Sequence, residues 1–404
     1  MYDVMEGVRV IEVAEHTFVP AAAVVLADWG ADVIKIERHG GDVARHMTIL
    51  QQPGQKRNGF FEVANRGKRS VGLDLGQAAG RKLLYALVET ADVFLTNLRG
   101  SARRKMEIEA ADLFAINPTL VYARGTGYGM RGAMAEDGGF DYPSSWCRSG
   151  SGYAQTPPGG GRPPQQPGSV GDLTGGATLA GAISAALFRR ERTGRGAVVD
   201  HALYGMGTYI MTQGLASTSL AMQTASSAGA GPPAPRMQNP LVRLYETRDD
   251  RWLCLCFLQD RWFADLARRI GRADLAKDPR FRDERAKQEN ADALIAELDA
   301  EFAKRTLAEW NDVLRGAEGV WAPLQSPPEV LADEQALVNG FVTEVTGKDG
   351  DSYLAGATPG QFDERPVGAL AASPAYGQHT DEVMRELGRT PAEIASLRAQ
   401  DVIA

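Results

Sequence analysis

The chain has 404 residues, 44% hydrophobic and 24% charged, which is typical of a globular protein long enough for two domains. Its net charge of −7 argues against nucleic acid or an anionic membrane as the main partner. No apolar run reaches the ~18 residues of a membrane span, the five histidines lack metal-ligand spacing, and the three cysteines form no disulfide framework. We therefore expect a cytoplasmic protein without a metal, a nucleic acid or a membrane partner.

The first third of the chain alternates strand and helix patterns. Buried strands are expected at residues 8–13, 33–36, 70–75, 92–98 and 120–124, with helices at 21–29, 78–90 and 112–116. This alternation predicts an α/β fold with a wound, mostly parallel sheet.

The remainder of the chain has a different texture. Residues 125–171 are rich in Gly, Pro and Ser, and long loops in compact domains usually serve a site. Hairpins are expected at 244–257 and around 348–351, and helices through about residue 337. We predict a large domain at 1–222, a linker at 223–235, a small α+β domain at 236–337 and a C-terminal segment at 338–404.

Asp172 follows the Gly/Pro-rich stretch and stands ahead of a helix expected at residues 174–192. A carboxylate at a helix N-terminus meets a partial positive charge and free N–H groups, which should keep it ionised. An ionised and positioned carboxylate can act as a covalent nucleophile. Aspartate is also among the best N-cap residues, and the local pattern alone favours the cap.

The first strand–helix turn, residues 15–20, lacks the G-x-G-x-x-G glycines of a dinucleotide site. Glu37 ends the second strand, where an acid that binds ribose would lie, but without the glycines we expect no nucleotide redox cofactor. Basic residues gather in the same part of the chain: Arg38, Arg66, Lys68, Arg69, Arg99, Arg103, Arg104 and Lys105. Each alone is typical of a solvated surface, whereas together at one rim they could hold a polyphosphorylated cofactor without a metal.

Several short segments occur in a characteristic order. They are residues 30–37 (GADVIKIE), 65–75 (NRGKRSVGLDL), 92–99 (DVFLTNLR), 117–122 (NPTLVY), 171–176 (GDLTGG), 278–281 (DPRF) and 379–383 (HTDEV). In this order the segments resemble the family III CoA-transferases, which include formyl-CoA transferase and, as relatives, the α-methylacyl-CoA racemases. The resemblance extends over almost the whole chain.

This resemblance implies an activity and a site. Asp172 occupies the nucleophile position of the family's G-D-x-x-G-G motif, which favours the nucleophile over a cap. Coenzyme A, bound as a substrate, is implied to contact Thr17, Phe18, Arg38, Leu73, Asp74, Leu75, Gly76, Asn97, Leu98, Arg99 and Lys105. Phe140, Gly175 and Gly176 are implied to border the substrate pocket. The C-terminal segment is implied to complete the large domain, and two chains to interlock as a dimer.

The chain also departs from its relatives. Racemases carry a histidine where this chain has Phe140, and a phenyl ring cannot exchange a proton. Residues 229–231 are a poor match to the glycine run that shields intermediates in formyl-CoA transferase, which favours an acid larger than formate or oxalate. A CoA-transferase using Asp172 is therefore the main hypothesis. An acyl-CoA racemase or epimerase, and a non-catalytic CoA-binding subunit paired with a paralogue, are the alternatives.

Overall fold

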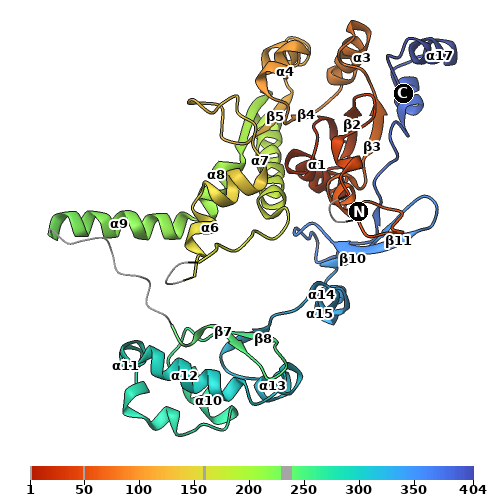
Figure 1. Ribbon diagram of the computed structural model, residues 1–404. Coiled ribbons are helices and arrows are strands. Elements are labelled where there is room, and N and C mark those ends of the chain that lie inside the picture. Colours follow the sequence, from red (N-terminus) through yellow and green to blue (C-terminus); the bar gives the residue numbers. More distant parts are fainter. Residues whose placement is uncertain (1, 49–50, 158–160, 229–238) are drawn as a thin grey trace. The chain divides into compact units, whose positions relative to one another are not determined.

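The computed structural model describes residues 2–48, 51–157, 161–228 and 239–404 (Figure 1). The chain forms two compact units, Met1–Ser219 with Glu334–Ala404, and Leu220–Asp333. We predicted a linker at residues 223–235. Residues 223–228 instead belong to helix α9 (Thr212–Ala228), and residues 229–235 lie outside the described residues.

The larger unit is built on a parallel sheet. Its strands are β1 (Arg9–Val13), β2 (Asp32–Glu37), β3 (Arg69–Gly72), β4 (Val93–Thr96), β5 (Val121–Thr126) and β6 (Ala197–Ala202). They pair in parallel in the order β3-β2-β1-β4-β5-β6, which confirms the predicted α/β fold. The order reverses between β1 and β4, and ligands of such sheets bind in the crevice at the carboxyl ends of these strands.

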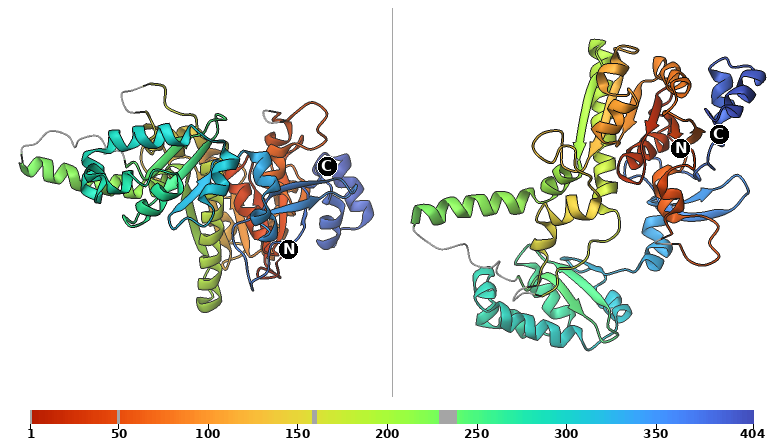
Figure 2. Two further views of the ribbon diagram at one scale, coloured as in Figure 1. Left: turned by 90° about the horizontal axis from the view of Figure 1, so that it is seen from below. Right: turned by 45° about the horizontal axis from the view of Figure 1, so that its top comes forward.

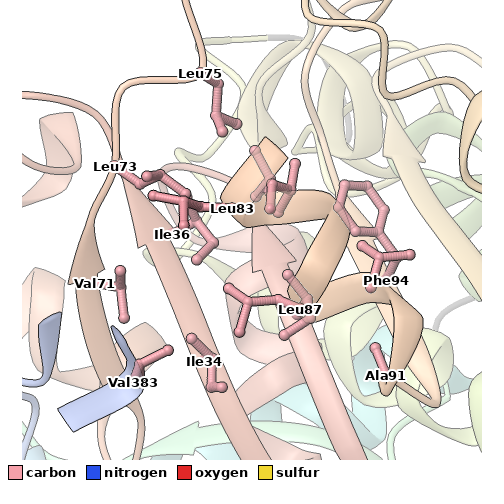
Figure 3. Close-up of a cluster of buried hydrophobic side chains, with 14 of the residues drawn as sticks. Ile34, Ile36, Val71, Leu73, Leu75, Leu83, Leu87, Ala91, Phe94 and Val383 are labelled. Carbon is pink, nitrogen blue, oxygen red and sulfur yellow. The ribbon is translucent and has the colours of Figure 1, made fainter. Parts of the chain in front are cut away.

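The two faces of the sheet have separate cores because successive strand residues point to opposite sides. Val10 and Val93 belong to the cluster with α1 (Phe18–Asp28) and α7 (Val170–Thr193). Neighbouring Ile11 and Phe94 belong to the cluster with α3 (Ala78–Glu89). Figure 3 shows part of this second cluster, in which Val383 from the C-terminal segment lies among side chains of β2 and β3.

Further helical segments of the larger unit connect these layers. They are η1 (Val43–His46), α2 (Gly59–Asn65), α4 (Gly100–Lys105), α5 (Ala110–Phe114), η2 (Tyr142–Cys147), α6 (Ser151–Ala154), α8 (Leu203–Ile210) and α15 (Glu334–Val338). The stretch expected as a loop at 125–171 therefore contains two short helical turns, η2 and α6, before α7 begins.

The C-terminal segment packs on the edge of the sheet. Its elements are β10 (Val342–Thr346), β11 (Ser352–Gly356), β12 (Leu370–Ala371), α16 (Thr380–Glu386) and α17 (Pro391–Ala399). The backbone N–H of His379 donates to Ser70 O at 2.9 Å, and that of Ala404 donates to Gly72 O at 3.1 Å. The chain end thus pairs with β3, and residues from Glu334 onward belong to the larger unit.

The smaller unit is α+β. Its strands β7 (Val242–Glu246), β8 (Trp252–Cys256) and β9 (Val320–Pro323) are antiparallel, with β7 and β8 forming the expected hairpin. Its helical segments are α10 (Trp262–Arg269), η3 (Leu275–Lys277), η4 (Pro279–Phe281), α11 (Glu284–Glu289), α12 (Ala291–Phe302), α13 (Leu307–Leu314) and α14 (Pro327–Ala332). Buried Tyr245, Phe302 and Trp310 form the aromatic centre of its core.

Helix α7 lies alongside the sheet (Figures 1 and 2) and packs on α1. A Cβ at Gly175 would lie 2.7 Å from Phe18 Cε2, and one at Gly176 would lie 2.7 Å from Ala21 Cβ. Two glycines therefore bring the helices into close contact.

We expected no run long enough to cross a membrane. By length and composition alone α7 meets that criterion, and it is the only helix of the described ranges to do so.

We predict that Gly176→Val destabilises the protein, since the new side chain would displace the α1 main chain at Ala22 N, 3.0 Å from the Cβ position. Overpacking of this kind costs about 1–3 kcal/mol. Gly181→Ala on the same helix is the control, because nothing lies within 4 Å of its Cβ position. Helix propensity should make that change neutral or stabilising by up to ~1 kcal/mol. Thermal unfolding followed by circular dichroism measures both, and an unchanged Tm for Gly176→Val would contradict the packing.

Candidate active site

Asp172 lies in the first turn of α7 and is half-buried. Helix α7 begins at Val170, not at Thr174 as expected, so Asp172 is inside the helix and not ahead of it. Burial and the nearby carboxylate of Asp141 raise the pKa of Asp172 to about 7. We expected the helix N-terminus to keep Asp172 ionised. A helix dipole contributes about 0.3–1 kcal/mol, which is less than the ~4 kcal/mol that this displacement of the pKa represents.

Asp141 is buried and accepts hydrogen bonds on both carboxylate oxygens. Its Oδ2 accepts from Gly171 N at 3.0 Å and from Gln166 Nε2 at 2.8 Å, and its Oδ1 accepts from Ser145 Oγ. The N-cap residue of α7 is Ser169, whose side chain makes no capping bond. Asp141 therefore satisfies an N–H group in the first turn of α7, from a segment about thirty residues earlier in the chain.

Asp172 consequently does not cap its own helix. Within the described residues its carboxylate accepts no hydrogen bond, and the groups that perturb its pKa are its burial and Asp141. The interpretation of Asp172 as a plain N-cap was wrong. None of the described residues donates to its oxygens, whereas the nearby Asp141 carboxylate accepts hydrogen bonds on both of its oxygens.

Three glycines allow this close arrangement. A Cβ at Gly171 would lie 2.2 Å from Asp141 Oδ1, and no side chain fits there. A Cβ at Gly127, just beyond β5, would lie 2.6 Å from Gly139 Cα. The loop that carries Asp141 is thus held against the sheet on one side and against α7 on the other.

The predicted substrate-pocket residues separate into two groups. Phe140 precedes Asp141, and its ring is 62% exposed and meets the His16 ring edge-on at 5.4 Å. Gly175 and Gly176 face α1, where the side chains of Phe18 and Ala21 cover them. The structure thus gives these two glycines a packing role, and their contact with substrate stays a prediction.

A cavity of about 210 Å³ lies at the carboxyl ends of the central strands. Six of the residues implied to bind CoA line it: Arg38, Leu73, Asp74, Leu75, Gly76 and Leu98. The cavity is also lined by Glu37 and by residues that sequence reasoning missed: Val13, Ala14, Glu15, Ile36, Asp42 and Met106. Most of these residues lie at the ends of β1 and β2. They could have been identified from the sequence, because ligands of wound sheets bind at the carboxyl ends of the strands.

The other five residues implied to bind CoA do not line this cavity. Thr17 and Phe18 are buried at the start of α1, where the Phe18 ring packs against His201 as well as Gly175. The side-chain amide of Asn97 binds the backbone of Glu15. Its Oδ1 accepts from Glu15 N at 3.0 Å, and its Nδ2 donates to Glu15 O at 2.6 Å.

Arg99 precedes helix α4 as its N-cap residue, and Lys105 is the last residue of that helix. The guanidinium of Arg99 lies against Gly138, where a Cβ would approach its Nη2 to 2.4 Å. Lys105 is exposed at the end of α4 and precedes Met106, which lines the cavity. Contact of either side chain with CoA stays a prediction.

Most of the basic residues that were expected to form one rim are paired with acidic side chains of the protein. Arg66 pairs with Asp28 at 2.8 Å, Lys68 with Glu12 at 2.5 Å and Arg69 with Asp32 at 2.6 Å, and the first two pairs are buried. Arg103 is also buried and pairs with Glu109 at 3.2 Å, while exposed Arg104 pairs with Glu136 at 3.2 Å. Of this basic set, Arg38 alone lines the cavity, where it pairs with Glu15 at 3.0 Å.

Glu37 is not available to a ribose. It is buried, its two oxygens each accept an N–H of Arg45 at 2.7 Å, and they also accept from Ser70 Oγ and Asp42 N. Although burial raises it, the hydrogen bonds from Arg45 and the charge of Lys35 hold the pKa of Glu37 below its usual range. Glu37 therefore stays an ionised structural partner at the end of β2.

We predict an acidic limb in the pH profile of kcat/KM. If Asp172 must be ionised, the rate falls as pH drops through about 7, the pKa of that carboxyl. Asp141→Asn removes the negative charge that raises this pKa, so the limb should move to lower pH. Ser145→Ala removes a hydrogen bond to Asp141 but not its charge, and its limb should stay in place. A limb that is unmoved in Asp141→Asn would show that the two carboxylates are not coupled.

Comparison with known proteins identifies the family of the chain. A model of CoA-transferase family III matches residues 5–380. The chain is 30% identical to an (R)-2-hydroxy-4-methylpentanoate CoA-transferase of Clostridioides difficile, over 99% of both chains. It is also 30% identical to a cinnamoyl-CoA:phenyllactate CoA-transferase of Clostridium sporogenes, over 98% of this chain and 96% of the relative.

Solved structures show the same fold. Rv3272 from Mycobacterium tuberculosis is 28% identical, with a TM-score of 0.79 over 94% of this chain and 98% of that one. A CAIB/BAIF family protein from Brucella suis is 27% identical, with a TM-score of 0.78 over 95% and 99% of the two chains. The chain belongs to CoA-transferase family III, and it is an enzyme of the CoA-transferase type.

Proposed function

We propose that this enzyme transfers CoA from an acyl-CoA donor to a carboxylic acid through a covalent intermediate on Asp172. The observation that carries the proposal is the half-buried Asp172 carboxylate, which accepts no hydrogen bond from the described residues and has a pKa of about 7. A carboxylate without hydrogen-bond donors keeps its lone pairs free for attack. Its raised pKa also makes the ionised form more basic and therefore a better nucleophile, while a substantial fraction remains ionised near neutral pH.

The chemistry balances without ATP. The Asp172 carboxylate attacks the thioester carbonyl of the donor, which forms a mixed anhydride and expels CoA thiolate. The thiolate attacks the aspartyl carbonyl, which gives an aspartyl-CoA thioester and releases the donor acid as a carboxylate. The acceptor carboxylate then attacks that thioester, and the expelled thiolate attacks the acceptor carbonyl, which yields the new acyl-CoA and free Asp172.

The cavity at the sheet's carboxyl edge is proposed to hold the nucleotide end of CoA. Its apolar lining includes Leu73, Leu75 and Leu98, which suit a base, and Arg38 stands at its rim for a phosphate. Lys105 and Arg99 lie at the ends of neighbouring α4 and are proposed as further phosphate contacts. No metal and no other cofactor enters this chemistry.

The acid is proposed to carry an apolar group larger than that of formate or oxalate. Phe140, which precedes Asp141, is exposed and its ring packs against that of His16, and we propose that this aromatic surface borders the carboxylate pair. A mass-spectrometric screen of CoA donors against carboxylate acceptors identifies the pair, and a preference for formate or oxalate would contradict the proposal.

The enzyme is proposed to work as an interlocked dimer. Large apolar side chains of α8 and α9 are exposed in the single chain: Tyr209, Ile210, Leu215, Leu220 and Met222. Apolar surface of this kind marks an interface with another protein chain. A second copy of this chain is the proposed partner, and obligatory copurification with a paralogue would favour a heteromer instead.

We predict that Asp172→Ala loses transfer activity by on the order of 10³-fold or more, as removal of a covalent nucleophile does. The variant should still bind CoA in calorimetry, and light scattering should give it the same dimeric mass as the wild type. Retention of more than a tenth of wild-type turnover would remove Asp172 from the nucleophile role.

The racemase alternative has its own signature. With acyl-CoA and no acceptor, the transferase mechanism should leave an aspartyl-CoA thioester on the enzyme. Hydroxylamine should convert this thioester to a hydroxamate on the peptide that contains Gly171, Asp172 and Leu173. A racemase would instead leave that peptide unmodified and bring solvent deuterium to the α-carbon of recovered acyl-CoA. A hydroxamate on Asp141 would keep the reaction class but move the nucleophile.

A further inference from the structure

The turn between β1 and α1 adopts its shape without glycine. It runs from Ala14 to Thr17, at the point where the strand order reverses between β1 and β4. His16 has φ of +66°, in the left-handed region that disfavours a residue with a side chain. Such a conformation persists only where the surroundings over-determine it. The contacts that hold this turn are therefore informative.

Asp42 binds the strained residue directly. Its carboxylate accepts from His16 N at 3.1 Å and from Ala44 N at 2.9 Å, and it forms an ion pair with Lys35 Nζ at 2.8 Å. Asp42 lines the cavity but is only 1% exposed. Its Oδ1 accepts from both N–H groups, and its Oδ2 faces the Lys35 ammonium in the ion pair without accepting a hydrogen bond from the described residues, so the carboxylate is engaged within the protein. Asp42 therefore affects the cavity by fixing the backbone of the turn between β1 and α1.

Lys35 fixes the same turn from its other end. Its fully buried ammonium donates to Ala14 O at 2.8 Å and to Glu12 Oε1 at 2.8 Å, in addition to the pair with Asp42. Although burial lowers it, the charges of Glu12, Asp42 and Glu37 raise the pKa of Lys35 above its ordinary value. One permanent positive charge thus anchors Ala14 directly and His16 through Asp42.

Asn97, directly after β4, completes the restraint. Its amide binds both the N–H and the C=O of Glu15, the residue between the two that Lys35 and Asp42 hold. Three successive residues of the turn therefore have main-chain groups fixed by buried or half-buried side chains. Two of them, Ala14 and Glu15, line the cavity together with Leu73 and Gly76.

We propose that Asp42, charged and paired with Lys35, is a positioning residue for CoA binding. It holds His16 in its left-handed conformation and so shapes the cavity wall, a role that glycines play in the first turn of dinucleotide folds. The inference rests on the proposed function, because it takes the cavity to be the CoA site.

The first test compares two buried carboxylates. Asp42→Asn should raise the Kd of CoA in calorimetry and the KM for acyl-CoA by tenfold or more, with kcat changed less than threefold. Asp28→Asn is the matched control, since Asp28 is as buried and pairs with Arg66 at the far end of α1. It should lower Tm without changing Kd. Equal Kd changes in the two variants would mean that Asp42 contributes stability alone, and the proposal would fail.

A double variant tests whether Asp42 acts through His16. Glycine adopts positive φ without strain, so His16→Gly reduces the need for the restraint. In the His16→Gly background, Asp42→Asn should raise the Kd of CoA by less than threefold. The same tenfold loss in both backgrounds would overturn the proposed route.

Leu98→Trp separates this inference from the function on which it rests. The larger side chain narrows the cavity and leaves the residue at position 42 unchanged. Weaker CoA binding in Leu98→Trp, with unchanged binding in Asp42→Asn, would overturn the positioning role alone. Unchanged CoA affinity in Leu98→Trp would show that CoA binds elsewhere, and both proposals for this cavity would fall.

Discussion

The contact between α7 and α1 governs the position of Asp172. Gly175 and Gly176 let α7 lie directly on Phe18 and Ala21, and one turn earlier Gly171 lets it meet Asp141. These three glycines fall on the buried side of the helix, so Asp172 is carried to the neighbourhood of the second carboxylate. A side chain at any of them would move the first turn of α7, and Asp172 with it.

The two carboxylates of the site are in unequal environments, which suits unequal roles. Asp141 is buried with donors on both oxygens and caps α7, whereas Asp172 is half-buried without a donor among the described residues. The charge of Asp141 makes Asp172 more basic, while its hydrogen bonds keep α7 in place. The helix α1 connects this pair to the cavity, because Phe18 in its first turn packs on Gly175 directly after the turn that Asp42 and Asn97 hold.

Local patterns predicted the sheet and a helix next to Asp172, and contacts distant in sequence account for what was missed. Alternating strands and helices were sufficient for a parallel sheet. Gly171 ends the Gly/Pro-rich stretch and is a poor helix former, so the helix was expected only from Thr174, and the contacts of Gly171 with Asp141 override that propensity. Asp141 is distant in sequence from the helix that it contacts, and the acidic partners of Arg66 and Lys68 are distant in sequence from those basic residues. No local pattern indicates these contacts.

In the proposed mechanism an oxygen of Asp172 takes part in the chemistry. If the acceptor acid is labelled with ¹⁸O in its carboxylate, each mixed anhydride leaves one labelled oxygen on the aspartyl group when thiolate attacks the acceptor carbonyl. After turnover with a CoA donor, mass spectrometry should find ¹⁸O in the peptide that contains Asp172, and none without the donor. An unlabelled peptide under conditions of active transfer, or label confined to Asp141, would contradict the account.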